Sequence, residues 1–293
     1  MKKMKLFCFG FGQVAQKFVK KIFSEKILVE LAATSREKTA IKTFENISYK
    51  SFNFSKDSFD KELVNNLISS DHILISIPPA QGTNIVLKSF KKILEQNKKN
   101  LKWLCYLSAT SVYGNHDGQW VDEKSKTNPT STNGIDRLNA EKEWLNFSLK
   151  HNLPFQIFRL SGIYSNENNI LLKLKSGDAK IIKKKEHCFS RIHVEDIANI
   201  LFKSLFNFKS GEIYNISDDQ PSTTEEMILY GAKLLQLKNP DSIELNEATS
   251  EMLKNFYKDS KKVDNKKMKE FFNYKLKYPS YVEGLNYIFN NSI

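Results

Sequence analysis

Lys5-Leu-Phe-Cys-Phe-Gly10-Phe-Gly12-Gln-Val-Ala15 is the stretch of sequence that decides the fold. The run Lys5–Phe9 predicts a buried strand, and Gln13–Ser24 has the apolar spacing of an amphipathic helix. The Gly-x-Gly-x-x-Ala turn between them permits a tight bend, lets the backbone approach a pyrophosphate, and allows close helix–strand packing. Because the first turn of a helix offers unpaired N–H groups to an anion, this context predicts a dinucleotide site rather than an ordinary glycine turn. Its expected cofactor-binding residues are Gly10, Gly12, Gln13 and Val14.

The second strand, expected at Leu28–Thr34, indicates which cofactor is preferred. An NAD site usually has an acidic residue about 20 residues beyond the glycines, where it binds the ribose hydroxyls. This chain has Thr34-Ser35-Arg36 there, and Arg36 is one of only four arginines among 45 basic residues. Hydroxyls and a guanidinium suit a 2′-phosphate, so the sequence favours NADP over NAD. The alternative is that Arg36 is a solvated loop cation.

Apolar runs alternate with helical periodicity through the first half of the chain. This pattern is typical of an α/β fold with a doubly wound parallel sheet, the Rossmann architecture. Further strands are expected at Ser48–Phe52, His72–Ile77, Trp103–Ser108 and Phe155–Leu160, and further helices at Leu63–Ile68, Asn84–Gln96 and Leu138–His151. Ligands bind beyond the carboxyl ends of such strands, so Ile77, Pro78 and Ser108 are also expected to contact the cofactor.

The second half is less regular. We expect helices at Asn169–Ser176, Val194–Phe206 and Ser222–Leu235, and a short strand at Ile213–Ile216. Residues 1–165 are predicted to form the NAD(P)-binding domain, with its sheet completed by about 194–218. Residues 166–193 and 219–293 are predicted to form a smaller C-terminal substrate lobe.

The composition excludes several classes of protein. The chain has 293 residues, 40% of them hydrophobic, which is too many for a disordered chain. It has no apolar run of membrane-spanning length and no signal-peptide pattern, so we expect a cytoplasmic protein. Three widely spaced cysteines and five scattered histidines match no metal site or disulfide framework. The net charge of +12 comes mainly from dispersed lysines, which indicates a solvated surface more than a nucleic-acid site.

Several segments carry a resemblance to a known family. They are Gly10–Ala15, Leu107-Ser-Ala-Thr-Ser-Val-Tyr-Gly114, Arg159-Leu-Ser-Gly-Ile-Tyr164 and Phe189-Ser-Arg-Ile-His-Val-Glu-Asp196. Together they resemble the short-chain dehydrogenase/reductase superfamily, in particular its extended and atypical NAD-dependent epimerase/dehydratase-like proteins. The resemblance implies a Rossmann sheet, a C-terminal substrate lobe and a Ser/Thr–Tyr–Lys catalytic set. It also implies that Ser161 lies near the nicotinamide.

The chain departs from that catalytic set at every member. Ala109 stands at the position of the serine or threonine, Asn133 at that of the tyrosine and Arg137 at that of the lysine. An asparagine amide does not titrate in the required range, and arginine does not exchange protons. Arg137 is therefore expected to hold a cofactor ribose or phosphate, and Thr110 and Ser111 to contact substrate.

Tyr113 and His193 are the candidate catalytic residues that remain, and Arg191 is a candidate for holding an anionic substrate group. Each has a structural alternative: Tyr113 as a core aromatic, His193 as a helix cap, and Arg191 as a partner of Glu195 or Asp196. If the functional interpretation is right, Tyr113, Ser161, Arg191 and His193 line one pocket beside the nicotinamide.

Three functions follow from these observations. The first is an NAD(P)-dependent oxidoreductase or epimerase/dehydratase-like enzyme acting on a small polar substrate, such as a sugar nucleotide. The second, favoured by the lost catalytic set, is an NADP-binding sensor or scaffold without turnover. The third, RNA binding, rests on charge alone and conflicts with the scarcity of arginine. No metal, nucleic-acid or membrane partner is expected, and a homodimer is left open.

Overall fold

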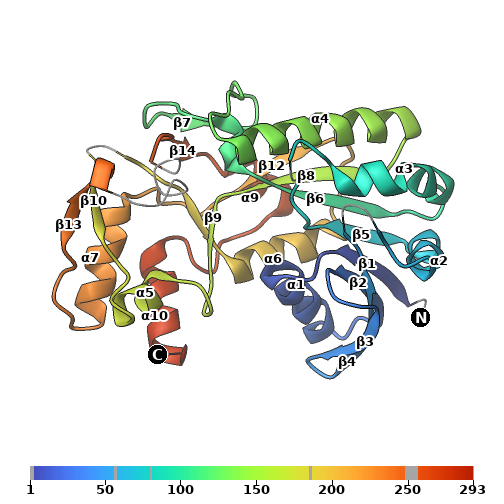
Figure 1. Cartoon of the computed structure of the whole chain (residues 1–293), viewed down its shortest axis with the longest axis horizontal. Coiled ribbons are helices and arrows are strands. Elements are labelled where there is room, and N and C mark those ends of the chain that lie inside the picture. The colour runs from blue at the N-terminus through green and yellow to red at the C-terminus, as the bar shows by residue number, and fades with distance from the viewer. Residues whose placement is uncertain (1–2, 56–57, 80, 185–186, 248–256, 293) are drawn as a thin grey trace. The chain divides into compact units, whose positions relative to one another are not determined.

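The computed structural model describes residues 3–55, 58–79, 81–184, 187–247 and 257–292. An eight-stranded sheet has the order β12-β8-β6-β5-β1-β2-β4-β3 (Figure 1). Neighbours among β1, β2, β4, β5 and β6 pair in parallel, and β3 pairs antiparallel with β4. The predicted doubly wound α/β fold is therefore confirmed. The strands are β1 (Met4–Phe9), β2 (Val29–Ser35), β3 (Ala40–Phe44), β4 (Ile47–Asn53), β5 (His72–Ile75), β6 (Trp103–Ala109), β8 (Phe155–Leu160) and β12 (Ile213–Ile216).

Helices cover both faces of this sheet. On one face, the Trp103 ring of β6 packs 5.7 Å from Phe18 of α1 and donates to the Ser204 hydroxyl of α6 at 3.1 Å. On the other, Phe9 of β1 packs 5.4 Å from Phe90 of α3. Alternate residues of a strand point to opposite faces, which is why these strands are apolar throughout. The helices are α1 (Gln13–Ser24), α2 (Glu62–Ser69), α3 (Ile85–Asn97), α4 (Thr132–His151) and α6 (Val194–Ser204).

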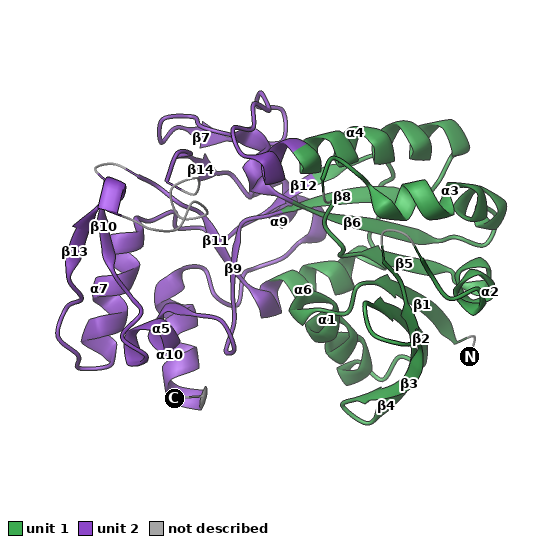
Figure 2. Cartoon of the chain, viewed as in Figure 1, with its two compact units in different colours: residues 1–108, 136–159, 197–213 green, residues 109–135, 160–196, 214–293 purple. Residues whose placement is uncertain are grey.

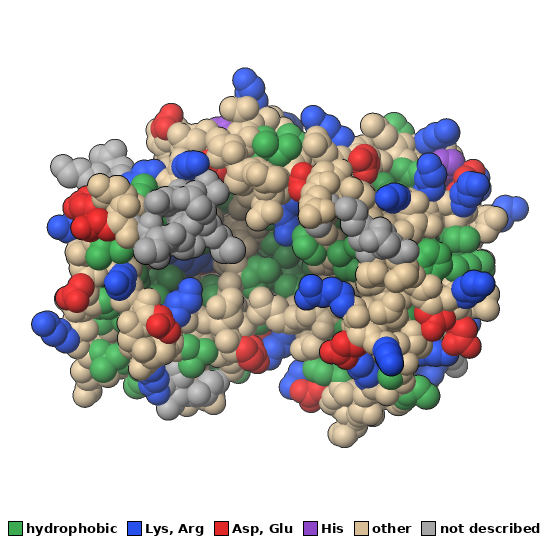
Figure 3. All heavy atoms as spheres, viewed as in Figure 1, with side chains coloured by type: hydrophobic (Ala, Val, Ile, Leu, Met, Phe, Trp, Pro, Cys, Tyr) green, Lys and Arg blue, Asp and Glu red, His purple; other side chains and the backbone are tan. Residues whose placement is uncertain are grey.

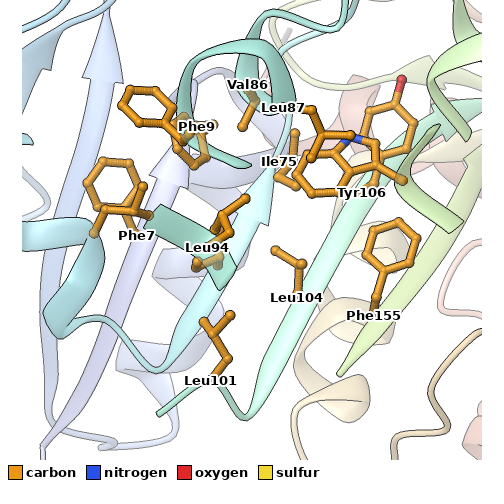
Figure 4. Close-up of a cluster of buried hydrophobic side chains, with 14 of the residues drawn as sticks. Phe7, Phe9, Ile75, Val86, Leu87, Leu94, Leu101, Leu104, Tyr106 and Phe155 are labelled. Carbon is orange, nitrogen blue, oxygen red and sulfur yellow. The ribbon is translucent and has the colours of Figure 1, made fainter. Parts of the chain in front are cut away.

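The main hydrophobic core lies between the sheet and the helices α2, α3 and α4. Figure 4 shows side chains of β1, β5, β6 and β8 pointing toward Val86, Leu87 and Leu94 of α3. Phe7, Leu94 and Leu104 are fully buried. A core of this kind fixes the strands in register, and so places their carboxyl ends along one edge of the sheet.

The chain divides into two compact units, shown in Figure 2. Unit 1 comprises residues 1–108, 136–159 and 197–213, and unit 2 comprises 109–135, 160–196 and 214–293. Unit 2 has its own core, in which Leu171, Ala232 and Ile288 are fully buried. Its further elements are η1 (Thr110–Tyr113), β7 (Trp120–Val121), β9 (Gly162–Tyr164), α5 (Ile170–Lys175), β10 (Ile181–Lys183), β11 (Arg191–His193), α7 (Thr224–Leu234), β13 (Ser242–Glu244), η2 (Leu245–Glu247), β14 (Lys262–Val263), α9 (Lys266–Phe272) and α10 (Tyr281–Ser292). The proposal that a C-terminal lobe binds substrate stays a prediction.

Most expected elements are present, with differences at their ends. α4 begins at Thr132 instead of Leu138, because the Ser131 hydroxyl accepts a hydrogen bond from the Gly134 amide at 3.2 Å and starts the helix earlier. β5 ends at Ile75 instead of Ile77, before two prolines that cannot donate to a strand ladder. The short strands of unit 2 and the helices α9 and α10 were not predicted.

The surface carries many lysines. On the face drawn in Figure 3, basic side chains are scattered among acidic and neutral ones. Within the part of the chain that the structure describes, no helix is long and apolar enough to cross a membrane.

Candidate functional site

The glycine turn of unit 1 is held in place by two hydroxyl groups. Gly10 has φ +85°, a conformation that favours glycine. Its N–H donates to the Thr34 hydroxyl at 2.9 Å, and its carbonyl accepts from the Ser76 hydroxyl at 3.1 Å. A Cβ at Gly10 would lie 2.8 Å from the Ser76 oxygen, so no larger residue fits without displacing that contact. We call Thr34 and Ser76 the Gly10 clamp.

The first turn of α1 has the properties of an anion site. Gly12 is its N-cap, no side chain caps it, and no acidic residue lies in the first turn. The amides of Gln13, Val14 and Ala15 have no acceptor within the helix, because their i−4 positions precede it. A Cβ built on Gly12 meets no atom within 4 Å, so there is open space beside the turn. These features fit a pyrophosphate bound by backbone N–H groups and the helix dipole.

Thr34 and Ser35 direct their hydroxyls into the protein. Thr34 is 1% exposed and its oxygen is engaged by Gly10. The Ser35 oxygen lies 3.1 Å from the Ser51 hydroxyl and accepts from the Glu37 amide at 3.3 Å. The Thr34 hydroxyl thus holds the glycine turn, and its direct contact with a cofactor stays a prediction.

Arg36 lies beyond the end of β2 with an exposed side chain. Its carbonyl accepts from the Asn53 side-chain amide at 3.1 Å, which fixes the backbone of the loop. The acidic neighbour, Glu37, pairs with Lys42, which lowers the pKa of the Glu37 carboxyl. The first carboxylate after β2 in the sequence is thus already paired with a lysine.

The carboxyl end of β6 brings Ser108 and Arg137 together in unit 1. Arg137, from α4, donates to the carbonyl of Leu107 at 3.2 Å, immediately before Ser108. Ser108 is 2% exposed, and no described residue pairs with its hydroxyl. Arginine has five donors, so the bond to the Leu107 carbonyl leaves Arg137 able to bind a further oxygen. Ile77 and Pro78 follow β5; Ile77 is half-buried and Pro78 is exposed.

Tyr113 is part of a buried network of unit 2. It is fully buried and donates to the Asn215 side-chain oxygen at 2.7 Å. The Asn215 backbone amide donates to Glu123 at 2.7 Å, and its side-chain amide to the carbonyl of Asp264 at 3.1 Å. Burial raises the pKa of Glu123. The network ties the Tyr113 turn to β12 and to the segment after β14, as a structural aromatic would. Among its neighbours, Thr110 is buried, and Ser111 is half-buried.

Arg191 is buried and hydrogen-bonded to the chain just before α7. Its guanidinium donates to the Ser222 hydroxyl at 2.7 Å and to the carbonyls of Phe189, Ser222 and Thr223 at 3.1 to 3.4 Å. It pairs with neither Glu195 nor Asp196, the two partners considered from sequence. Instead, burial lowers the pKa of Arg191 and nearby Asp218 raises it.

His193 is the last residue of β11, directly before α6, and aromatic rings lie close to it. Its Nδ1 accepts from the Glu195 amide at 3.3 Å, which is the capping contact considered from sequence. Its ring lies 4.1 Å from that of Tyr278 and 5.1 Å from that of Tyr164. Glu195 accepts from Lys277 at 2.7 Å and from the Tyr278 hydroxyl at 3.1 Å.

Pairing of β11 with β9 brings part of the predicted pocket together. Arg191 lies opposite Gly162, and His193 opposite Tyr164. Ser161, directly before Gly162, is 4% exposed, and its hydroxyl has no partner among the described residues. A pocket shared by Tyr113, Ser161, Arg191 and His193 stays a prediction. No group of metal-ligating side chains occurs among the described residues.

Two features of the site were missed from sequence. Ser76 carries a signal that could have been used, since it is a hydroxyl residue directly after a buried strand. Lys261 carries none, because it is one of many lysines in a basic tail. Only the folded chain shows its largely buried side chain donating to the carbonyl of Gly114, directly after Tyr113.

The model of the NAD dependent epimerase/dehydratase family matches residues 12–217. The chain belongs to this family. A functionally unknown conserved protein from Silicibacter pomeroyi DSS is 31% identical, with 98% of both chains covered and a TM-score of 0.86. No curated protein matches this family member significantly.

Two further solved structures share the fold of this epimerase/dehydratase family member at lower identity. A dTDP-glucose 4,6-dehydratase from Bacillus anthracis, in complex with NAD, is 17% identical over 98% of this chain and 96% of that one, with a TM-score of 0.76. A UDP-N-acetylglucosamine 4-epimerase from Bacillus cereus is 16% identical over 98% of this chain and 99% of that one, with a TM-score of 0.74. The resemblance stated from sequence is thus confirmed at the level of the family.

Proposed function

We propose that the chain is an NAD(P)-dependent oxidoreductase or epimerase of atypical type, acting on a small polar substrate such as a sugar nucleotide. The observation that carries the proposal is the turn from Gly10 to Val14. It combines a clamped left-handed glycine, an uncapped helix N-terminus and open space beside Gly12. A purely structural glycine turn would need neither the uncapped helix N-terminus nor the open space beside Gly12.

NADP is the proposed cofactor, with NAD as the alternative. The support is the exposed guanidinium of Arg36 and the pairing of Glu37 with Lys42, which leaves a basic strand end for the 2′-phosphate. Two solved structures with a similar fold contain NAD, which is an observation on those two proteins. Arg137, Ser108, Ile77, Pro78 and Ser161 are the remaining proposed cofactor contacts.

The substrate class is proposed from the family and from two solved structures of one protein with a similar fold. Structures of one protein at 16–17% identity are named as complexes with UDP-glucose and with UDP-glucuronic acid. In this chain, Thr110, Ser111 and Arg191 are the proposed substrate contacts. Arg191 is the least accessible of the three to a substrate, because its guanidinium is buried and hydrogen-bonded to Ser222.

A binding protein without turnover is the second candidate. This candidate is favoured by the residues at the positions where the family's tyrosine and lysine belong. Asn133 is exposed there, and Arg137 donates to the Leu107 carbonyl. Calorimetric titration with NADP⁺ and NAD⁺ tests the site. Absorbance at 340 nm, or product analysis, with UDP-glucose, UDP-glucuronic acid and UDP-N-acetylglucosamine tests turnover. Binding together with turnover supports the enzyme, binding alone supports the sensor, and no binding refutes both.

A further inference from the structure

The loop between β2 and β3 carries two opposite charges next to one another. Arg36 and Glu37 directly follow Ser35, the last residue of β2, and both side chains are exposed. The side-chain amide of Asn53, at the end of β4, donates to the carbonyls of Arg36 and Glu37, at 3.1 and 3.0 Å. The Glu37 amide donates to the Ser35 hydroxyl at 3.3 Å. The backbone of this loop is therefore fixed from two sides, and both charges project from the same short stretch.

The two charges of this loop favour different cofactors. After the second strand of a dinucleotide-binding sheet, a carboxylate accepts hydrogen bonds from the ribose hydroxyls of NAD, whereas an arginine accommodates the 2′-phosphate of NADP. A carboxylate beside the 2′-phosphate repels it, because a phosphate group is an anion at neutral pH. An unpaired Glu37 would therefore favour NAD and oppose Arg36. Which cofactor this loop selects depends on whether the charge of Glu37 is neutralised.

Lys42 of β3 neutralises Glu37. Its ammonium group donates a hydrogen bond to the Glu37 carboxylate. This contact lowers the pKa of Glu37 and raises that of Lys42, so both groups are charged at neutral pH. The side chain of Lys42 is 31% exposed and that of Glu37 74%. An ion pair at the surface contributes little to folding, so its main consequence is the net charge that it leaves beside Arg36.

The position of Lys42 in β3 puts this ion pair on the side of the glycine turn. Lys42 and Phe44 are two residues apart in one strand, so their side chains lie on the same face. The Phe44 ring packs 5.4 Å from that of Phe11, the residue between the two glycines of the turn. Lys42 also lies opposite Tyr49 of β4, whose ring is 4.8 Å from that of Phe11. Lys42 therefore reaches Glu37 from the face on which the glycine turn packs, within unit 1.

We propose that Lys42 determines the cofactor specificity of the glycine-turn site, by neutralising Glu37 so that Arg36 can bind the 2′-phosphate of NADP. The inference rests on the proposed function, in which this turn binds a dinucleotide. Lys42 is a positioning residue, because it acts through Glu37 and does not touch the cofactor. Without the charge of Lys42, the Glu37 carboxylate repels the 2′-phosphate of NADP and is free to accept from the ribose hydroxyls of NAD. Loss of this one lysine therefore shifts the preference from NADP toward NAD.

Two other roles of Lys42 compete with this one: direct contact with the 2′-phosphate, and merely fastening β3 to the loop. Lys42→Met removes the charge and keeps an apolar stem of similar length. The double variant Glu37→Gln with Lys42→Met also removes the carboxylate, and it recovers NADP affinity only if Lys42 acts through Glu37. Lys20→Met is the matched control, because Lys20 of α1 is paired at 2.8 Å with Glu45, in the turn between β3 and β4.

The experiment is calorimetric titration of the wild type and these variants with NADP⁺ and with NAD⁺. In Lys42→Met, we expect the Kd of NADP⁺ to rise about fivefold, the factor for two like unit charges about 4 Å apart in water. The Kd of NAD⁺ should stay the same or fall. The double variant should bind NADP⁺ with a Kd within about twofold of wild type, as a pair of coupled residues predicts. Lys20→Met should leave both Kd values unchanged.

The outcomes are distinguishable. A loss of NADP⁺ affinity in Lys42→Met that the double variant does not restore means direct contact with the phosphate, and equal losses for both cofactors mean a fastening role. Either result, or an unchanged NADP⁺ Kd in Lys42→Met, overturns the inference and leaves the proposed function standing. A wild type that binds neither dinucleotide overturns both, and one that prefers NAD⁺ overturns the NADP assignment together with the inference. A loss confined to NADP⁺ that the double variant restores supports the inference.

Discussion

Replacing Thr34 by valine should weaken binding of both dinucleotides by about the same factor. Valine keeps the shape of threonine but removes the oxygen that accepts from the Gly10 amide at 2.9 Å. Leaving a buried N–H without an acceptor costs about 1–3 kcal/mol. Without this acceptor the turn would shift to pair the N–H elsewhere, and a bound cofactor would have to restore the original conformation. Since about 1.4 kcal/mol corresponds to a factor of ten, we expect Kd to rise about tenfold.

The assay is calorimetric titration of wild type, Thr34→Val and Thr34→Ser with NAD⁺ and with NADP⁺. Thr34→Ser restores the hydroxyl and should recover most of the affinity. Ser204→Ala is the matched control, because it removes another hydroxyl of unit 1 that accepts from an N–H, that of Trp103 at 3.1 Å. It should lower thermal stability without changing Kd.

Two results would refute this reasoning. Wild-type affinity in Thr34→Val would mean that the Gly10 clamp does not shape the phosphate site. A loss confined to NADP⁺ would mean that the Thr34 hydroxyl contacts the 2′-phosphate directly, as the sequence alone suggests.

Three further predictions concern charge. Arg36→Ala should weaken NADP⁺ binding by about 1–3 kcal/mol and leave NAD⁺ almost unchanged in the same titration, because only NADP carries the 2′-phosphate; equal losses would exclude a specific contact. Burial lowers the pKa of His72 below its ordinary 6.5, so folding opposes its protonation. The free energy of unfolding should therefore fall as the pH drops below about 6.5. In denaturant titrations, the wild type should lose more of this free energy at low pH than His72→Asn does. Glu141→Gln removes a buried carboxylate that accepts from Arg159 at 2.7 Å, which should cost about 3–5 kcal/mol and lower the melting temperature by about 10 °C in calorimetry.

The sequence by itself determined the framework of unit 1. Most strands and helices from Lys5 to Leu160 could be predicted because each burial pattern is local: a strand buried on both faces is apolar throughout, and a covering helix is apolar on one side. The edge strand β3 was missed because its side chains are mostly exposed. The Gly10–Ala15 turn was predictable for the same reason, since strand, turn and helix are consecutive in the chain. The family resemblance also came from contiguous motifs, and it correctly located the family.

The tertiary structure decided what side chains do once distant segments meet. The parallel pairing of β1 with β2 turns the Thr34 hydroxyl toward Gly10, a contact that the sequence did not indicate. The strands β9 and β11 have three residues each and exist only because they pair with one another, so no periodicity predicted them. Lys261 shows the limit most plainly. In the sequence it is one basic residue in a basic tail, and its burial and its contact with Gly114, 147 positions away, arise only when the chain folds.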